Sequence, residues 1–416
     1  MEVGISTDRA GRVARTGAAP APWARIGLIL AALGPGVIGL VANNDAGGML
    51  SYLVTGANRG LEWILPALVL LGLPIVFIQW VALRVAQATG LPYGKALSAA
   101  AGRLPARVEA VALYVLNTLI LATEFVGMTA ALALGGVPIT LALPITFCLV
   151  VALTSASVYV RIERLLLYVA SATLVFFPAL MLVHHRPGAL MAAFVGPGRH
   201  TAFLLLALAG NSIAPWMIYW QQNATWSGRA RSQRQQNWDL GIGVVAFMLM
   251  AATVILLGAV ASGTPGDMAV PLLWLFRAGG AVSGSLFAVG IFDAGLLAAC
   301  TISLSSLWTL REAVGAGAGD PGAAPNRGGW FAVHLATLAA AAAIALPSHL
   351  AAGRMALWVN ALNGIWMPVS LTLLGVVAGN RRVMGRQALS WCVRLALWGL
   401  AAGFALLAGV GLAGGL

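Results

Sequence analysis

The sequence predicts an all-α polytopic membrane protein, in which two inverted five-helix repeats precede an eleventh helix. Three observations lead to this prediction. The chain is very hydrophobic, its basic residues alternate between successive loops, and polar breaks interrupt the first and sixth hydrophobic segments. Paired broken helices in corresponding halves are typical of secondary transporters that bind their ions near the middle of the membrane.

Composition alone excludes a soluble domain. Of the 416 residues, 60% are hydrophobic and only 9% are charged, and the mean hydropathy is +0.90, far from the balance of globular proteins. Windows of membrane-spanning length predict eleven helices, at 26–55, 61–84, 108–133, 137–158, 164–184, 201–225, 239–262, 282–306, 329–347, 355–376 and 391–413. They form one transporter domain, 26–416, after a polar tail, 1–25.

The net charge of +12 predicts an orientation and not a nucleic-acid partner, because the basic residues form no patch. With the N-terminus in the cytoplasm, 18 of the 24 Lys and Arg residues fall in cytoplasmic segments and five fall outside. This bias follows the positive-inside rule. It predicts a multi-pass protein of the cell membrane with a cytoplasmic N-terminus and the lipid bilayer as its surroundings.

The first span contains the break Asn43–Gly48, whose Asp45 is a carboxylate within an otherwise hydrophobic segment. A charge at the membrane centre costs at least about 2.5 kcal/mol on insertion scales, and unwound backbone is tolerated there only when it lines a cavity or lies inside protein. The sixth span contains a second break, Asn211–Trp216. Since five spans precede it, we predict repeats at 26–184 and 201–376, and an odd-numbered repeat re-enters the membrane in the opposite sense.

The remaining spans carry few polar residues. Glu124 lies in the third span, Asp293 in the eighth, and Asn360 and Asn363 in the tenth; the Gly/Pro/Ala-rich stretch 315–329 predicts a cytoplasmic loop before the ninth. Single cysteines and histidines near span ends or loops provide no disulfide framework and no metal-ligand spacing. The chain has no nucleophile–base or metalloenzyme motif, so we expect neither an enzyme nor a resident cofactor.

Each polar residue has a structural alternative. Asp45 could cap a half-helix, and Glu124 and Asp293 could form hydrogen bonds between helices. The side chains of Asn43, Asn44, Asn211 and Gln221 face either a cavity or neighbouring helices. Trp216 is a gate or ordinary packing, and Asn360 and Asn363 either face the site or join helices.

Two motifs resemble those of the Nramp family of divalent-metal transporters. Gly34-Pro35-Gly36 is followed by Asp45-Ala46-Gly47-Gly48 at the spacing at which that family has Gly-Pro-Gly and Asp-Pro-Gly-Asn. Ala214-Pro215-Trp216 stands in the register of its Met-Pro-His. The resemblance extends from Gly34 to Gly385. It implies a leucine-transporter-like (APC) fold and a metal site around Asp45 with Ala42, Gly48, Asn211, Ala214 and Asn360, together with a pathway that includes Asn44, Glu124, Trp216, Gln221 and Asp293.

The departures from the family pattern concern the ligands. Gly48 replaces the family's asparagine and Ala214 its methionine. A thioether favours transition metals, whereas Mg²⁺ prefers oxygen ligands and retains several waters. The chain therefore resembles the Nramp-related magnesium transporters, which implies Mg²⁺ and Mn²⁺ as substrates.

The positions of the family's proton relay also differ. They read Trp216, Gln221, Leu121 and Glu124, so only the glutamate is retained. This implies import by alternating access without proton coupling, with a proton-coupled Mn²⁺/Fe²⁺ transporter as the alternative. An ion-coupled amino-acid transporter of the same fold is more remote, because Asp45 would repel a substrate carboxylate.

Overall fold

The structure is a computed structural model that describes residues 34–58, 60–155, 166, 169–183, 188–194, 196, 200–227, 232–261, 271–314, 329–348 and 351–414. The predicted tail 1–25, the first residues of span one and the predicted loop 315–329, except Gly329, lie outside the described residues. The first repeat contains α2 (Pro35–Ala42), α3 (Ala46–Ala57), α4 (Leu61–Thr89), α5 (Tyr93–Ala101), α6 (Arg103–Leu134), α7 (Ile139–Ser155), η2 (Thr173–Val175) and α9 (Phe176–Leu182).

After α10 (Ala189–Phe194), the second repeat contains α11 (Thr201–Ser212), α12 (Trp216–Ser227), α13 (Gln233–Ala261), α14 (Pro271–Ala313), α15 (Gly329–Ser348) and α16 (Ala352–Gly379). The chain continues through α17 (Arg381–Met384) and η4 (Gly385–Gln387) to α18 (Trp391–Gly414). A kink at Gly280, where φ is +69°, leaves Gly280–Ala313 as the membrane-crossing part of α14.

These helices follow the predicted spans in order, and eight segments within the described residues are long and apolar enough to cross a membrane. Several helices extend beyond their predicted ends. Helix α6, which corresponds to predicted span three, begins at Arg103, and α13, which corresponds to span seven, begins at Gln233. A helix can continue past the hydrocarbon core into the polar interface, where hydropathy no longer identifies it.

The first predicted break is confirmed, but it is shorter than expected. Only Asn43, Asn44 and Asp45 leave the helix, and α3 begins at Ala46. Gly47 and Gly48 therefore belong to the first turn of a helix. The second break covers 213–215, where Pro215 provides no backbone N–H to continue the ladder of α11.

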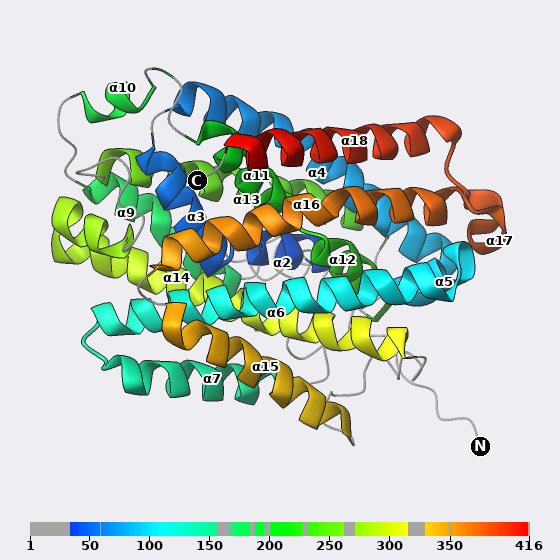
Figure 1. Cartoon of the computed structure of the whole chain (residues 1–416), viewed down its shortest axis with the longest axis horizontal. Helices are drawn as coiled ribbons and strands as arrows, with labels where there is room; N and C mark the ends of the chain where they lie inside the picture. The colour runs from blue at the N-terminus through cyan, green and yellow to red at the C-terminus, as the bar shows by residue number, and fades with distance from the viewer. Residues whose placement is uncertain are drawn as a thin grey trace, which may run out of the picture.

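The broken helices lie inside the bundle, as Figure 1 shows for α2 and α3 behind α16. Helix α3 packs on α13 and α16, while α6 and α14 form an extensive contact beside it. Every described residue of α2 and α3 is buried. The polar breaks are thus surrounded by protein and not by lipid.

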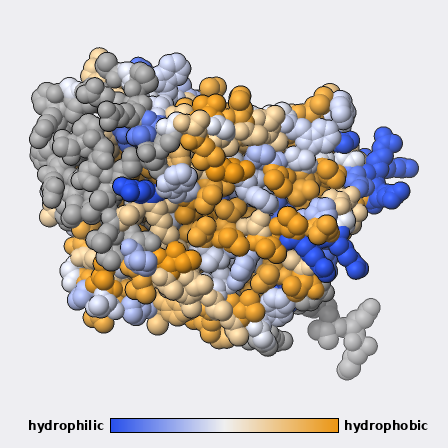
Figure 2. Space-filling model, in the orientation of Figure 1, coloured by the Kyte–Doolittle hydropathy of each residue, from blue (hydrophilic) through white to orange (hydrophobic). Residues whose placement is uncertain are grey.

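The outer surface matches a membrane environment. Figure 2 shows hydrophobic side chains across the middle of the face in view, and hydrophilic ones at the right-hand end, where Figure 1 places α5 and α17. Basic residues at that end include Arg381 and Arg382 on α17. We therefore treat this end as the one that the charge bias assigns to the cytoplasm.

Candidate functional site

The two breaks are joined directly. Asn43 Nδ2 donates a hydrogen bond of 2.5 Å to the backbone carbonyl of Asn211, and Asn211 Nδ2 donates one of 2.6 Å to the hydroxyl of Tyr52. Asn44 Nδ2 donates to the carbonyl of Phe247 on α13 at 3.0 Å. These amide nitrogens thus face neighbouring helices, and they hold α2, α3, α11 and α13 together at one level of the bundle.

Asp45 caps the second half of the first broken helix. It precedes α3, and its Oδ1 accepts a hydrogen bond from the backbone N–H of Gly48. Its other oxygen, Oδ2, has no hydrogen-bond partner among the described residues. The structural role considered for Asp45 is therefore real, yet it uses one carboxylate oxygen and leaves the other available.

Gly48 lies against both candidate side chains. A Cβ atom built on Gly48 would lie 2.6 Å from Asn211 Nδ2, 2.8 Å from Asn211 Oδ1 and 2.8 Å from Asp45 Oδ1. All three distances are shorter than real Cβ contacts allow. The structure thus brings together three predicted site residues, Asp45, Gly48 and Asn211, and the amide of Asn211 fills the space that a side chain at position 48 would need.

A second carboxylate, that of Glu124, meets the same helix end. The backbone N–H of Ala46 donates to Glu124 Oε2 at 2.8 Å, and the Thr123 hydroxyl donates to Oε1 at 3.3 Å. Glu124 on α6 is completely buried. Asp45 is therefore not the sole acid at the first break, because two carboxylates share the N-terminus of α3, where the helix dipole favours negative charge.

Further oxygen atoms at the first break are left without partners. The side-chain oxygens of Asn43 and Asn44 are buried and accept no hydrogen bond from the described residues. The carbonyl of Ala42, at the end of α2, accepts no backbone hydrogen bond from them either. Buried acceptors of this kind normally have a donor or a cation beside them. The break thus offers carboxylate, amide and carbonyl oxygens, the ligand set of hard cations.

Asn360 approaches the second break from α16. A Cβ on Gly210 would collide with the carbonyl oxygen of Asn360, so α11 and α16 are in backbone contact there, and Asn360 Nδ2 is buried without a partner among the described residues. Ala214 lies within the break and is 3% exposed. Neither residue forms a hydrogen bond with Asp45.

The remaining pathway candidates, Trp216, Gln221 and Asp293, form no hydrogen bond with Asp45. Trp216 is completely buried, with its ring centroid 6.4 Å from that of Trp220, which agrees with packing. Gln221 Nε2 bonds to Thr225 on its own helix at 3.3 Å. Asp293, on α14, has a buried Oδ2 without a partner among the described residues. Two residues further along, Gly295 packs against Ala46, so this part of α14 lies beside the N-terminus of α3.

Three acids that sequence reasoning missed also hold helix ends or join helices. Asp239 on α13 accepts from the N–H groups of Gly34, Gly36 and Val37, at 2.6, 2.8 and 3.2 Å, and so caps α2. Glu109 on α6 accepts from Trp366 and Ser370 of α16. Glu312, at the end of α14, accepts from Gly94 N–H and from Asn223 Nδ2 of α12. Their positions near predicted span ends were the one available signal.

The other titratable residues do not add a metal cluster. His334 Nε2 pairs with the hydroxyl of Thr154 at 2.8 Å, and the cysteines are free. Among the described residues, no group of three or more His, Cys, Asp or Glu side chains is placed to hold a metal ion. Any ion at the first break would therefore depend on few charged ligands and many neutral oxygens.

Comparison with known proteins places this arrangement in a family. The chain resembles crystal structures of the Eremococcus coleocola manganese transporter, one of a histidine-to-alanine mutant with a TM-score of 0.74 and 18% identity, and one of a complex with an aromatic bis-isothiourea substituted compound with a TM-score of 0.69 and 17% identity. Each match covers 95% of this chain and 88% of the other.

A more distant match is Mhp1, a nucleobase-cation-symport-1 family transporter in a closed conformation, with a TM-score of 0.58, 13% identity, and coverage of 92% of this chain and 90% of the other. These likenesses confirm the leucine-transporter-like fold.

A search of curated proteins gives no match. The family model described as natural resistance-associated macrophage protein-like (Nramp) matches residues 36–414. The chain therefore belongs to the Nramp family of divalent-metal transporters.

Proposed function

We propose that this protein imports Mg²⁺, and also Mn²⁺, by alternating access and without obligatory proton coupling. The observation that carries the proposal is the donor set at the first break. One carboxylate oxygen of Asp45 accepts from Gly48 N–H, and the amide oxygens of the two preceding residues, Asn43 and Asn44, lack a donor among the described residues. Gly48 and Ala214 supply no ligand side chain. Mg²⁺ is usually bound through one or two carboxylates and keeps several of its waters.

Enclosure of the site supports alternating access. Ala42, Asp45, Asn211, Ala214 and Asn360 are each at most 3% exposed, so an ion could enter or leave only after the surrounding helices move. The N-terminus of α2 is held by Asp239 from α13, and Trp220 Nε1 donates to the carbonyl of Pro35 at 3.1 Å. We infer that these contacts close one side and must separate when that side opens.

The absence of obligatory coupling rests on the replaced relay. Trp216, Gln221 and Leu121 cannot carry protons near neutral pH, and Glu124 is engaged by the N–H of Ala46. The membrane potential suffices as a driving force. At 100 mV it supplies about 2.3 kcal/mol per elementary charge, or about 4.6 kcal/mol for a divalent ion.

A proton-coupled Mn²⁺/Fe²⁺ transporter is the second candidate, and one observation favours it. Asp45 and Glu124 both bond to the first turn of α3, and two close carboxylates in a buried site can hold a proton between them. The likeness to a manganese transporter points the same way.

Uptake into proteoliposomes tests the proposal. Mg²⁺, Mn²⁺ and Ca²⁺ are supplied separately and in competition under an inside-negative potential. We expect Mg²⁺ to enter and to compete with Mn²⁺, and Ca²⁺ to enter poorly, because its larger shell requires more ligands. The magnesium assignment would be rejected if Mn²⁺ entered while a large excess of Mg²⁺ neither inhibited this uptake nor entered itself.

A further inference from the structure

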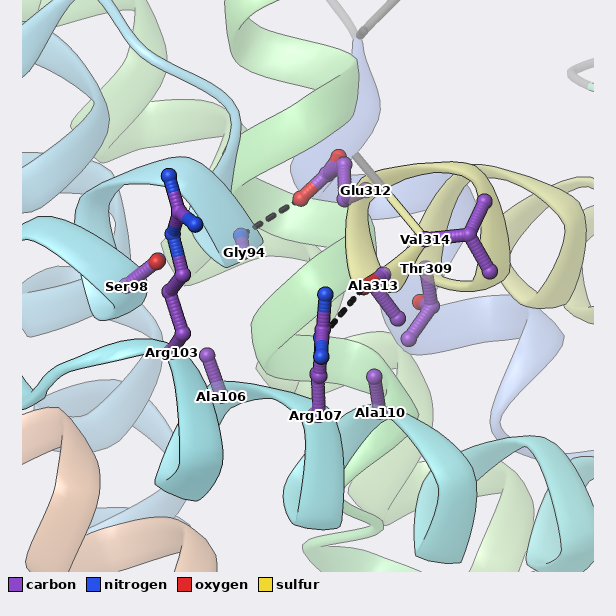
Figure 3. Close-up of a pocket in the computed structure, with 10 residues that line it drawn as sticks. All are labelled: Gly94, Ser98, Arg103, Ala106, Arg107, Ala110, Thr309, Glu312, Ala313 and Val314. Carbon is purple, nitrogen blue, oxygen red and sulfur yellow. Dashed lines mark hydrogen bonds between the residues drawn. The ribbon is translucent and has the colours of Figure 1, made fainter. Parts of the chain in front are cut away.

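A pocket lies at the Arg-rich end of the bundle, and none of its lining residues belongs to either break. It has a volume of about 280 Å³ and lies between α5, the first turns of α6 and the end of α14. In Figure 3, the guanidinium groups of Arg103 and Arg107 project from α6 into the same space, near Ser98 and Gly94. Their i, i+4 spacing places both on one face of the helix.

The positive charge of this pocket is not neutralised by its one acid. Glu312 forms the back wall, and its two carboxylate oxygens accept from Gly94 N–H and Asn223 Nδ2. Lys95 interacts with Glu312 electrostatically. Arg107 donates only its Nε, to the carbonyl of Ala313 at 3.3 Å, and Arg103 has no partner among the described residues. Two guanidinium groups therefore remain available to an anion.

An apolar strip runs from the pocket along the lipid side of α6. Leu104, Val108, Val111 and Val115 are 72%, 49%, 55% and 53% exposed. Their spacing places them on one face of α6, next to the face that carries Arg107. A ligand that matches both surfaces has an anionic head at the membrane interface and hydrocarbon chains in the bilayer.

We propose that this pocket binds the phosphate of an anionic phospholipid, whose acyl chains lie along Leu104, Val108, Val111 and Val115. Arginine is suited to phosphate because its planar fork donates two parallel hydrogen bonds. Basic pockets between transmembrane helices are known sites for the headgroups of anionic lipids. The volume accommodates a phosphate with a small alcohol. The bound lipid would connect α5, α6 and α14, of which α5 and α14 also meet through Gly94 and Glu312, and α6 and α14 through Arg107 and Ala313.

Native mass spectrometry of the full chain in detergent tests this site. The protein is titrated with phosphatidylglycerol or with phosphatidylcholine of the same chains, and bound lipids are counted. We expect one phosphatidylglycerol to bind preferentially. Arg103→Gln/Arg107→Gln should weaken this binding by roughly 30-fold, the effect of two basic residues at a membrane surface. The matched control Arg381→Gln/Arg382→Gln removes the same charge from exposed positions of α17 and should leave it unchanged.

Arg103→Gln alone is a second variant that should fold normally, because Arg103 forms no hydrogen bond or ion pair with another described residue. It should weaken phosphatidylglycerol binding by roughly fivefold. Inorganic phosphate and glycerol 3-phosphate distinguish a soluble anion from a lipid, and we expect neither to displace the lipid. Equal binding of both lipids, unchanged binding in both Gln variants, or displacement by either soluble phosphate would each overturn the proposal.

Discussion

Gly48→Ala tests the geometry at the first break. The added methyl group would lie 2.6 Å from Asn211 Nδ2 and 2.8 Å from Asp45 Oδ1, whereas carbon needs about 3.5–4.0 Å for an optimal contact. The Asn211 side chain must then move by about 1 Å, which breaks its bond of 2.6 Å to Tyr52. Overpacking costs about 1–3 kcal/mol, and the lost hydrogen bond costs about 0.5–1.5 kcal/mol.

These terms together give about 1.5–4.5 kcal/mol. If 2 kcal/mol of this falls on the ion-bound arrangement, binding weakens roughly 30-fold. The assay is the concentration dependence of Mg²⁺ uptake into liposomes, which should show a half-saturating concentration raised by at least about tenfold. Gly399→Ala and Gly403→Ala are matched controls on α18, because nothing lies within 4 Å of a Cβ at either position.

A double-mutant cycle identifies the cause. Removal of the Asn211 side chain in Gly48→Ala/Asn211→Ala relieves the collision, so the two changes should destabilise the protein in thermal unfolding by at least about 1 kcal/mol less than their sum. Parental Mg²⁺ affinity in Gly48→Ala, or strict additivity in the cycle, would refute the placement of Gly48 against Asn211 and Asp45.

Five further substitutions test other residues described above. Asp45→Asn removes the charge but keeps a good N-cap, so we expect abolished uptake with unchanged thermal stability; parental uptake would exclude Asp45 as the essential ligand. Ala214→Met adds a thioether, and it should shift competition toward Mn²⁺ and Cd²⁺; an unchanged preference would place residue 214 away from the ion. Glu124→Gln weakens the hydrogen bond that Ala46 N–H donates to residue 124. It should slow uptake without changing metal preference, which initial uptake rates measured with each ion will show. Both oxygens of Asp239 accept backbone N–H groups of α2 and its N-cap, so Asp239→Asn sets an NH2 donor against one of these N–H groups and should cost about 1–3 kcal/mol in unfolding. Asp293→Asn, whose Oδ2 lacks a described partner, should cost little.

The fold was largely predictable because the membrane imposes simple rules. Apolar length located the spans, and the requirement that buried polar backbone be satisfied made Asn43–Gly48 and Asn211–Trp216 recognisable as breaks. Their exact extent was not predictable. Helix α3 resumes at Ala46 because Asp45 and Glu124 satisfy its first N–H groups, and Gly47 and Gly48 serve close approach to Thr123 and Asn211 and not unwinding.

The site was predictable only in part. Asp45, Gly48 and Asn211 lie together in the structure, and their role in ion binding stays a prediction. The partners of the acids lie far away in sequence. Asp239 caps a helix more than 200 residues earlier, and Glu109 bonds to α16. Hydropathy places such acids at the ends of spans, where they resemble loop residues. Nothing local indicates that they are buried.

Internal pH recorded during metal entry tests the central claim, uniport of Mg²⁺, most directly. Liposomes that contain the protein and a pH-sensitive dye are clamped at an inside-negative potential, and Mg²⁺ or Mn²⁺ is added outside. We expect Mg²⁺ to accumulate under the potential alone, with no acidification in proportion to the ion that enters. Stoichiometric acidification that requires the metal and disappears in Glu124→Gln would contradict it.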